Sequence, residues 1–271
     1  MPGPVHLPRL KGLLATAALA AVLALPMAGC KTTGGGDVTG SLGAPRGEPQ
    51  SDAEWRQAAD YWGERYQADR ADPVAAMKFA QALRATDRKT QAAAVLEQAS
   101  IKHPHDRALL GEFGRALADV GKLQQALEVL GRAHTPDQPD WRILNAQGAV
   151  LDQLGRSQDA RRHYASALKI KPNEPSILSN LGLSYALTKD LPRAEATLRK
   201  AAAQPGAEPR VRQNLGLVVA LQGRFDEAER IVSADLPPAE AAAAVDELKE
   251  MIAQRGGMQR SGQRPQQRRR G

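Results

Sequence analysis

One pattern of large apolar, small and polar residues recurs at a fixed interval along most of the chain. The interval is 34 residues, and the small residues that mark it are Ala80, Gly114, Gly148, Gly182 and Gly216. Alanine follows each of them after 12 positions, and a large apolar residue follows after 16. Apolar residues three or four positions apart share one face of a helix. The pattern therefore predicts five pairs of helices, with pairs starting at Pro73, Arg107, Trp141, Pro175 and Pro209.

An interval of this length is the period of the tetratricopeptide repeat, a helix–turn–helix unit. Small residues let two helices approach closely, and the large apolar ones fill the space around them. Gly121, Gly155 and Gly223 stand where the first helix of a unit must stop. We therefore expect an all-α, right-handed tetratricopeptide-repeat solenoid, with units at 73–106, 107–140, 141–174, 175–208 and 209–238.

The two ends of the repeat array depart from the pattern, as terminal units of a solenoid do. Residues 51–72 are expected to form an N-terminal capping helix, covering the first unit with aromatic side chains. In the fifth unit Arg212 replaces a large apolar residue and Asp235 replaces an alanine, which predicts a short second helix. Residues 239–254 are expected to form a C-terminal capping helix with an apolar stripe.

The first 29 residues resemble a bacterial signal peptide, with a basic start and an apolar stretch from 12 to 25. The single cysteine of the chain, Cys30, follows Ala-Gly as in a lipoprotein signal, so we expect it to carry acyl chains that bind a membrane. Lys31 favours the periplasmic face of the outer membrane, and residues 30–50 have the composition of a flexible linker. An ordinary signal peptide cut near Ala28 is the alternative.

The formal net charge of +7 is unevenly distributed. The signal peptide and the segment 255–271, with six arginines and no acid, account for all of the excess and leave −1 for residues 30–254. We expect this arginine-rich tail to be disordered. It is suited to anionic lipid, glycan or an acidic partner, and a tail without a partner is an equal alternative. Nucleic acid is not expected as a partner of an exported protein.

No set of residues in the sequence has the spacing of a catalytic, cofactor or metal site. His103 and His105 lie at the join between two repeats, with no carboxylate or cysteine ligands at suitable spacing. We therefore expect a protein that binds other proteins and is not an enzyme.

The inner face of a stacked repeat array is formed by the first helix of each unit. In the last two units this face carries an apolar strip, which we call the leucine strip: Leu183, Leu187, Leu217 and Leu221. Arg210 and Gln213 edge it, and Asn145 and Asp152 continue the face in the third unit as polar positions. An apolar strip with a polar rim suits an amphipathic helix or an apolar peptide. Alternatively, the segment 239–253 folds back over Leu217 and Leu221.

Three segments resemble a particular group of repeat proteins: residues 145–152, 178–187 and 210–224. They are similar to the TadD-like lipoproteins of the Tad (tight adherence, Flp-type) pilus assembly system. The resemblance implies an outer-membrane scaffold for pilus assembly with a pilotin-like role for the secretin, and partners in the pilus and secretin machinery. The alternative is a periplasmic lipoprotein scaffold for cell-wall synthesis or outer-membrane protein assembly.

Overall fold

The computed structural model describes residue 49 and residues 51–262. The signal peptide, Cys30, the linker apart from residue 49, and the tail from residue 263 lie outside the described residues. Within the described part, no helix is long and apolar enough to cross a bilayer.

Twelve α-helices and no strand make up the described part of the chain. The helices are α1 (Asp52–Ala68), α2 (Pro73–Ala85), α3 (Lys89–Lys102), α4 (Arg107–Asp119), α5 (Leu123–Arg132), α6 (Trp141–Gln153), α7 (Ser157–Ile170), α8 (Pro175–Leu187), α9 (Leu191–Ala202), α10 (Pro209–Leu221), α11 (Phe225–Val232) and α12 (Pro238–Gly262). The first helices of the five units start at the five positions that the sequence pattern predicts. The prediction of an all-α tetratricopeptide-repeat solenoid is confirmed.

Local sequence explains where the helices begin and end. Asp72, Asp106 and Asp140 accept backbone N–H bonds at the starts of α2, α4 and α6. The turn inside a unit needs a residue with positive φ, which glycine adopts without strain. Gly155, with φ 76°, fills this place in the third unit, whereas Lys189, with φ 63°, fills it in the fourth.

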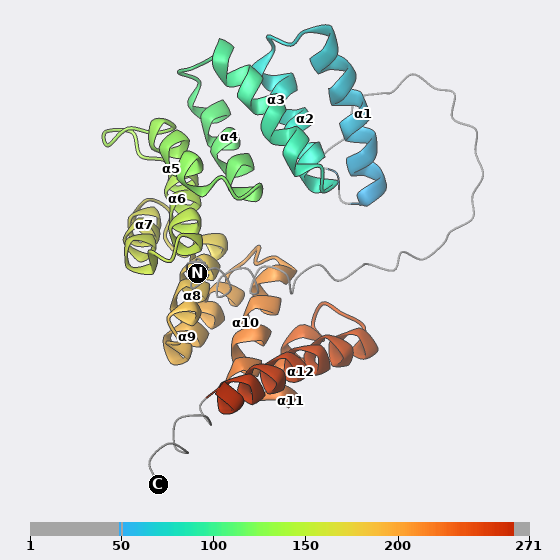
Figure 1. The fold of residues 1–271 in the computed structure, drawn as a ribbon, viewed down its shortest axis with the longest axis vertical. Coiled ribbons are helices and arrows are strands. Elements are labelled where there is room, and N and C mark those ends of the chain that lie inside the picture. The colour runs from blue at the N-terminus through green and yellow to red at the C-terminus, as the bar shows by residue number, and fades with distance from the viewer. Residues whose placement is uncertain (1–48, 50, 263–271) are drawn as a thin grey trace, which may run out of the picture.

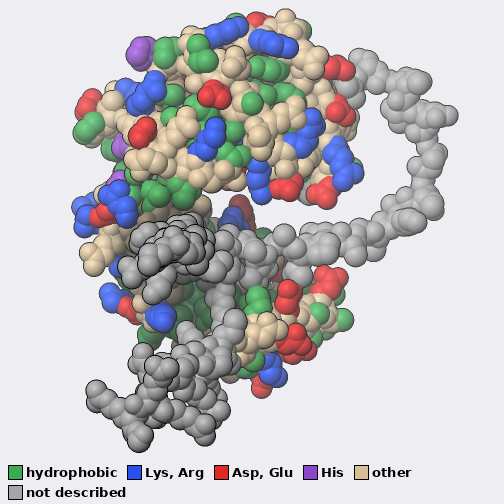
Figure 2. All heavy atoms as spheres, in the orientation of Figure 1, with side chains coloured by type: hydrophobic (Ala, Val, Ile, Leu, Met, Phe, Trp, Pro, Cys, Tyr) green, Lys and Arg blue, Asp and Glu red, His purple; other side chains and the backbone are tan. Residues whose placement is uncertain are grey.

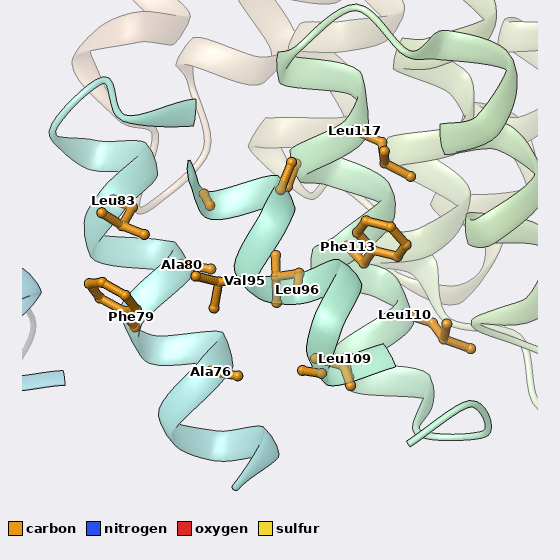
Figure 3. Packing of buried hydrophobic residues seen from close by; sticks show 14 of the residues in the cluster. Ala76, Phe79, Ala80, Leu83, Val95, Leu96, Leu109, Leu110, Phe113 and Leu117 are labelled. Carbon is orange, nitrogen blue, oxygen red and sulfur yellow. The ribbon is translucent and has the colours of Figure 1, made fainter. Parts of the chain in front are cut away.

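Close packing between the helices of one unit explains the small residues of the repeat. Figure 3 shows Ala80 on α2 in the first unit, close to the α3 side chains Val95 and Leu96, all of them buried. In the third unit a Cβ atom at Gly148 would lie 2.4 Å from the ring of Tyr164, closer than such atoms approach. The recurring glycine is therefore required by the contact between α6 and α7.

The stacked units form a curved array in which α4, α6, α8 and α10 line the inside of the curve (Figure 1). The second helices α5, α7 and α9 lie on the outside. Figure 2 shows the hollow of this curve, between the part built by α1–α4 and the part built by α10–α12. The inner face is therefore a broad, open surface.

The C-terminal end differs from the expected domain boundaries. The last helix, α12, continues to Gly262, so residues 255–262, which we predicted to be disordered, extend the helix. No proline interrupts the chain between Pro238 and Pro265, and most residues from 249 to 255 favour helices. The rest of the predicted tail, residues 263–271, lies beyond the described residues.

The two unusual residues of the fifth unit are partners of each other. The Arg212 guanidinium donates to both carboxylate oxygens of Asp235, with Nε 2.6 Å from Oδ2. The contact joins α10 to the segment after α11. In the second, third and fourth units these two positions hold a leucine and an alanine, such as Leu178 and Ala201, which belong to one buried cluster.

Candidate functional site

The leucine strip lies on two neighbouring first helices. Leu183 and Leu187 come from α8, Leu217 and Leu221 come from α10, and the two helices are in contact. Leu187 is 43% exposed and the other three are half-buried. Each leucine therefore keeps apolar surface in contact with solvent.

The C-terminal helix packs against a different set of residues. Its Ala241 and Val245 are buried in a cluster with Leu215, Val218 and Val219 of α10. Neither Leu217 nor Leu221 belongs to that cluster. The half-burial of these two leucines is thus compatible with a strip that a partner can still reach.

One end of the strip is polar, as the sequence indicates. Arg210 is exposed and Gln213 is half-buried. Arg210 lines a cavity of about 160 Å³ between the N-terminal ends of α8 and α10, together with Glu174, Glu208 and Asn214. Asn214 donates to Ser179 Oγ at 3.0 Å, and its buried Oδ1 has no partner.

Asp152, which we placed on the binding face, has a structural role instead. It is 9% exposed, and its carboxylate accepts hydrogen bonds from Tyr164 Oη at 3.0 Å and Ser184 Oγ at 2.9 Å. Burial raises the pKa of Asp152, while these hydroxyl groups and Ser157 act to lower it. Asp152 joins α6, α7 and α8 and has little surface left for a ligand.

Asn145 is half-buried and is bonded to the next unit. Its Oδ1 accepts a hydrogen bond of 3.0 Å from Asn180 Nδ2, which links α6 to α8. This bond orients the two amides beside each other on the inner face. Asn145 therefore joins the third unit to the fourth, next to α8, which carries Leu183 and Leu187 of the leucine strip.

A second hollow lies across the first three units. It has a volume of about 670 Å³, and Met77, Ala108, Trp141 and Ile143 are among its lining residues. The sequence pattern alone did not predict it. The signal was present, because the second unit has the small residues Ala108 and Gly111 at inner-face positions that carry larger side chains in its neighbours.

The histidines do not form a site. His103 Nε2 lies 2.6 Å from the carbonyl oxygen of Ala71, so this side chain joins two adjacent units. Among the described residues, no group of histidine, cysteine and carboxylate side chains has the arrangement of a metal site.

Comparisons with known proteins agree with the fold. The tetratricopeptide-repeat family matches residues 112–175 and 145–209, and the family of the anaphase-promoting complex (cyclosome) subunit 3 matches residues 56–133. A comparison with curated protein sequences finds no match.

Several solved structures are similar. PilW, described as a widely conserved type IV pilus biogenesis factor, is 16% identical with a TM-score of 0.59, covering 71% of this chain and 91% of PilW. A thermophilic tetratricopeptide-repeat protein of Thermus thermophilus, TTC0263, is 23% identical with a TM-score of 0.57, covering 67% and 97%. PilF of Pseudomonas aeruginosa is 16% identical with a TM-score of 0.50, covering 66% and 82%. At these identities the likeness shows the fold.

Proposed function

We propose that this chain, a tetratricopeptide-repeat solenoid, is a non-enzymatic scaffold that holds a protein partner on the inner face of its curve. The observation that supports the proposal is the apolar surface that the leucine strip keeps in contact with solvent on two neighbouring first helices, with a polar end at Arg210. Burial of such a strip by a partner contributes about 25 cal/mol per Å² of apolar area. Repeat solenoids use their concave surfaces in this way.

The shape of the strip defines the chemistry of the partner segment. Its leucines lie on two adjacent parallel elements, so an amphipathic helix or an extended apolar peptide can cover all four. At the polar end, the cavity is lined by Arg210, Glu174 and Glu208, whose charged groups suit a polar partner segment. The partner segment therefore has an apolar side and a polar end.

The biological setting that we propose is assembly of Tad/Flp-type pili, with a pilotin-like action on the secretin. The similarity of residues 145–152, 178–187 and 210–224 to TadD-like lipoproteins supports this setting, and the likeness of fold to the pilus biogenesis factor PilW is consistent with it. The protein is then an outer-membrane lipoprotein anchored through Cys30 and working in the periplasm. Its partners belong to the pilus and secretin machinery.

Two charges in the leucine strip test this function. Leu183→Glu with Leu187→Glu in the chromosomal gene is expected to abolish surface pili, because both carboxylates must be desolvated when the partner binds. The matched control is Ile101→Glu with Ile170→Glu, which places two charges at exposed apolar positions of the second helices α3 and α7. This control is expected to retain pili.

Folding and anchoring are checked in the same strains by circular dichroism of the purified variants and by membrane fractionation. Normal pili in a well-folded strip variant would contradict the proposal. So would equal loss of pili in the strip variant and in the control.

A further inference from the structure

We infer that the inner face of the first three units is a second binding surface, specific for a peptide segment in which an apolar side chain is flanked by aspartate or glutamate. This surface, which we call the front groove, is the hollow of about 670 Å³ described above. It uses none of the residues of the leucine strip. The scaffold would therefore hold two segments at once.

The front groove exists because the second unit has small residues, Ala108 and Gly111, where its neighbours have larger side chains. Ala108 is exposed and lines the hollow, whereas Gly111 is buried. A Cβ atom at Gly111 would lie 2.7 Å from Cδ1 of Ile143, so the glycine lets the third unit approach the second. Met77 and Trp141, both half-buried, line the hollow together with Ala108. The floor of the hollow is apolar at these three residues, and polar residues such as Glu112 and Arg115 complete its lining.

Two guanidinium groups at this floor have no carboxylate partner. Arg107 donates to the neutral amide oxygen of Gln138 at 2.6 Å. The guanidinium carbon of Arg142 lies 4.5 Å from the centre of the Trp141 ring. Both side chains are exposed and neither forms an ion pair within the described part of the chain.

The remaining charged groups of the front groove are already compensated. Arg115 pairs with Glu112 at 2.6 Å. Asp140 accepts the backbone N–H of Arg142 at 2.7 Å, at the start of α6 where a negative charge is favourable. The positive charge of Arg107 and Arg142 is therefore the part left for a ligand.

Charge and shape together define the occupant. A leucine, methionine or aromatic side chain fills the hollow over Ala108, and carboxylates on either side reach Arg107 and Arg142. Guanidinium groups bind carboxylates through paired hydrogen bonds, and they can stay stacked on an aromatic ring while doing so. A basic segment would place like charges together at the same positions.

Three capped seven-residue peptides serve as probes for the full chain. The first has two leucines flanked by glutamates, the second has lysines in place of the glutamates, and the third has serines in place of the leucines. Fluorescence anisotropy measures each affinity at low salt, and the indole N–H signal of Trp141 in NMR spectra reports where the probe binds. The acidic, apolar probe is expected to bind at least about tenfold more tightly than either of the others, and less tightly as salt is added.

Variants of exposed residues locate the interaction without disturbing the core. Arg107→Gln with Arg142→Gln is expected to weaken the acidic probe about fivefold, from the loss of two solvent-exposed ion pairs. Ala108→Leu fills the hollow and is expected to weaken binding of the acidic probe by at least as much. The charge-matched control, Lys169→Gln with Lys200→Gln on the outer helices, should leave the affinity unchanged.

The leucine-strip variant separates this inference from the proposed function. Leu183→Glu with Leu187→Glu is expected to leave binding of the acidic probe intact, whatever its effect on pili. Equal binding of acidic and basic probes would overturn the inference. An unchanged affinity of the Arg107/Arg142 variant for the acidic probe, or loss of binding of that probe by the leucine-strip variant, would overturn the inference as well.

Discussion

Replacing Gly148 by alanine tests the packing on which the whole repeat array depends. The added Cβ would lie 2.4 Å from Cε1 and 2.8 Å from Cδ1 of Tyr164. Tyr164 is 1% exposed and its hydroxyl donates to Asp152 at 3.0 Å. The ring has no free space to move into, so relief of the clash must displace the ring or separate α6 from α7.

The expected cost follows from three contributions to the free energy of unfolding. Overpacking a core of this kind costs about 1–3 kcal/mol. Weakening the bond from Tyr164 to the buried carboxylate adds about 1–3 kcal/mol. Alanine has a better helix propensity than glycine, which stabilises the folded state by about 1 kcal/mol. Gly148→Ala is therefore expected to destabilise the protein by about 1–5 kcal/mol.

Urea denaturation followed by circular dichroism measures the effect, with two controls from the same chain. Gly131 lies in α5 with nothing within 4 Å of a built Cβ, so Gly131→Ala should be neutral or stabilise by up to about 1 kcal/mol. Gly148→Ala with Tyr164→Leu should recover part of the loss, because the clashing ring is gone. A Gly148→Ala protein as stable as the wild type would refute the packing and the register of the repeats.

Three further predictions concern other parts of the chain. Asp235→Ala should cost about 1–3 kcal/mol in urea denaturation by leaving Arg212 unpaired, and adding Arg212→Leu should restore stability to within about 1 kcal/mol; a double variant worse than the single one would contradict the pairing. Burial raises the pKa of Asp152 in the folded state, so its contribution to stability is full below the usual carboxyl pKa and is lost as pH rises through the raised value. Asp152→Asn should therefore gain stability relative to the wild type as pH rises from the usual carboxyl pKa through the raised pKa of Asp152, and a relative loss over that range would show the opposite shift. Cys30→Ser should abolish labelling of the protein by fatty acid and its recovery in the membrane fraction. Unchanged recovery in that fraction, with no label on the wild-type protein, would favour the ordinary signal peptide.

The repeat architecture was predictable because its determinants are local and recur five times. Helix starts follow from the 34-residue interval, and turns follow from residues such as Gly155. The placement of the four strip leucines on two neighbouring helices, α8 and α10, follows from the same interval. Because the same pattern occurs five times, a wrong alignment of the repeat would conflict with every unit. The predicted starts of the five first helices therefore agree with the structure.

Pairings between distant residues were not predictable by the same reasoning. Asp152 has the inner-face position of its unit, yet Tyr164 and Ser184 from two other helices bind its carboxylate. The sequence marks Arg212 and Asp235 as departures, but only the stacked geometry shows that they meet. The front groove was missed for a related reason. It depends on the small residues Ala108 and Gly111, and on how the neighbouring units pack beside them.

Crosslinking in living cells tests the central claim, that the partner binds the inside of the curve. A photoreactive amino acid at Leu187, on α8, is compared with the same residue at Ile170, on the outer helix α7, because the two side chains are 43% and 41% exposed. The account predicts a crosslink from position 187 to one component of the pilus or secretin machinery, and no such crosslink from position 170. A crosslink from position 170 with none from position 187 would place the working surface on the outer face and contradict the account.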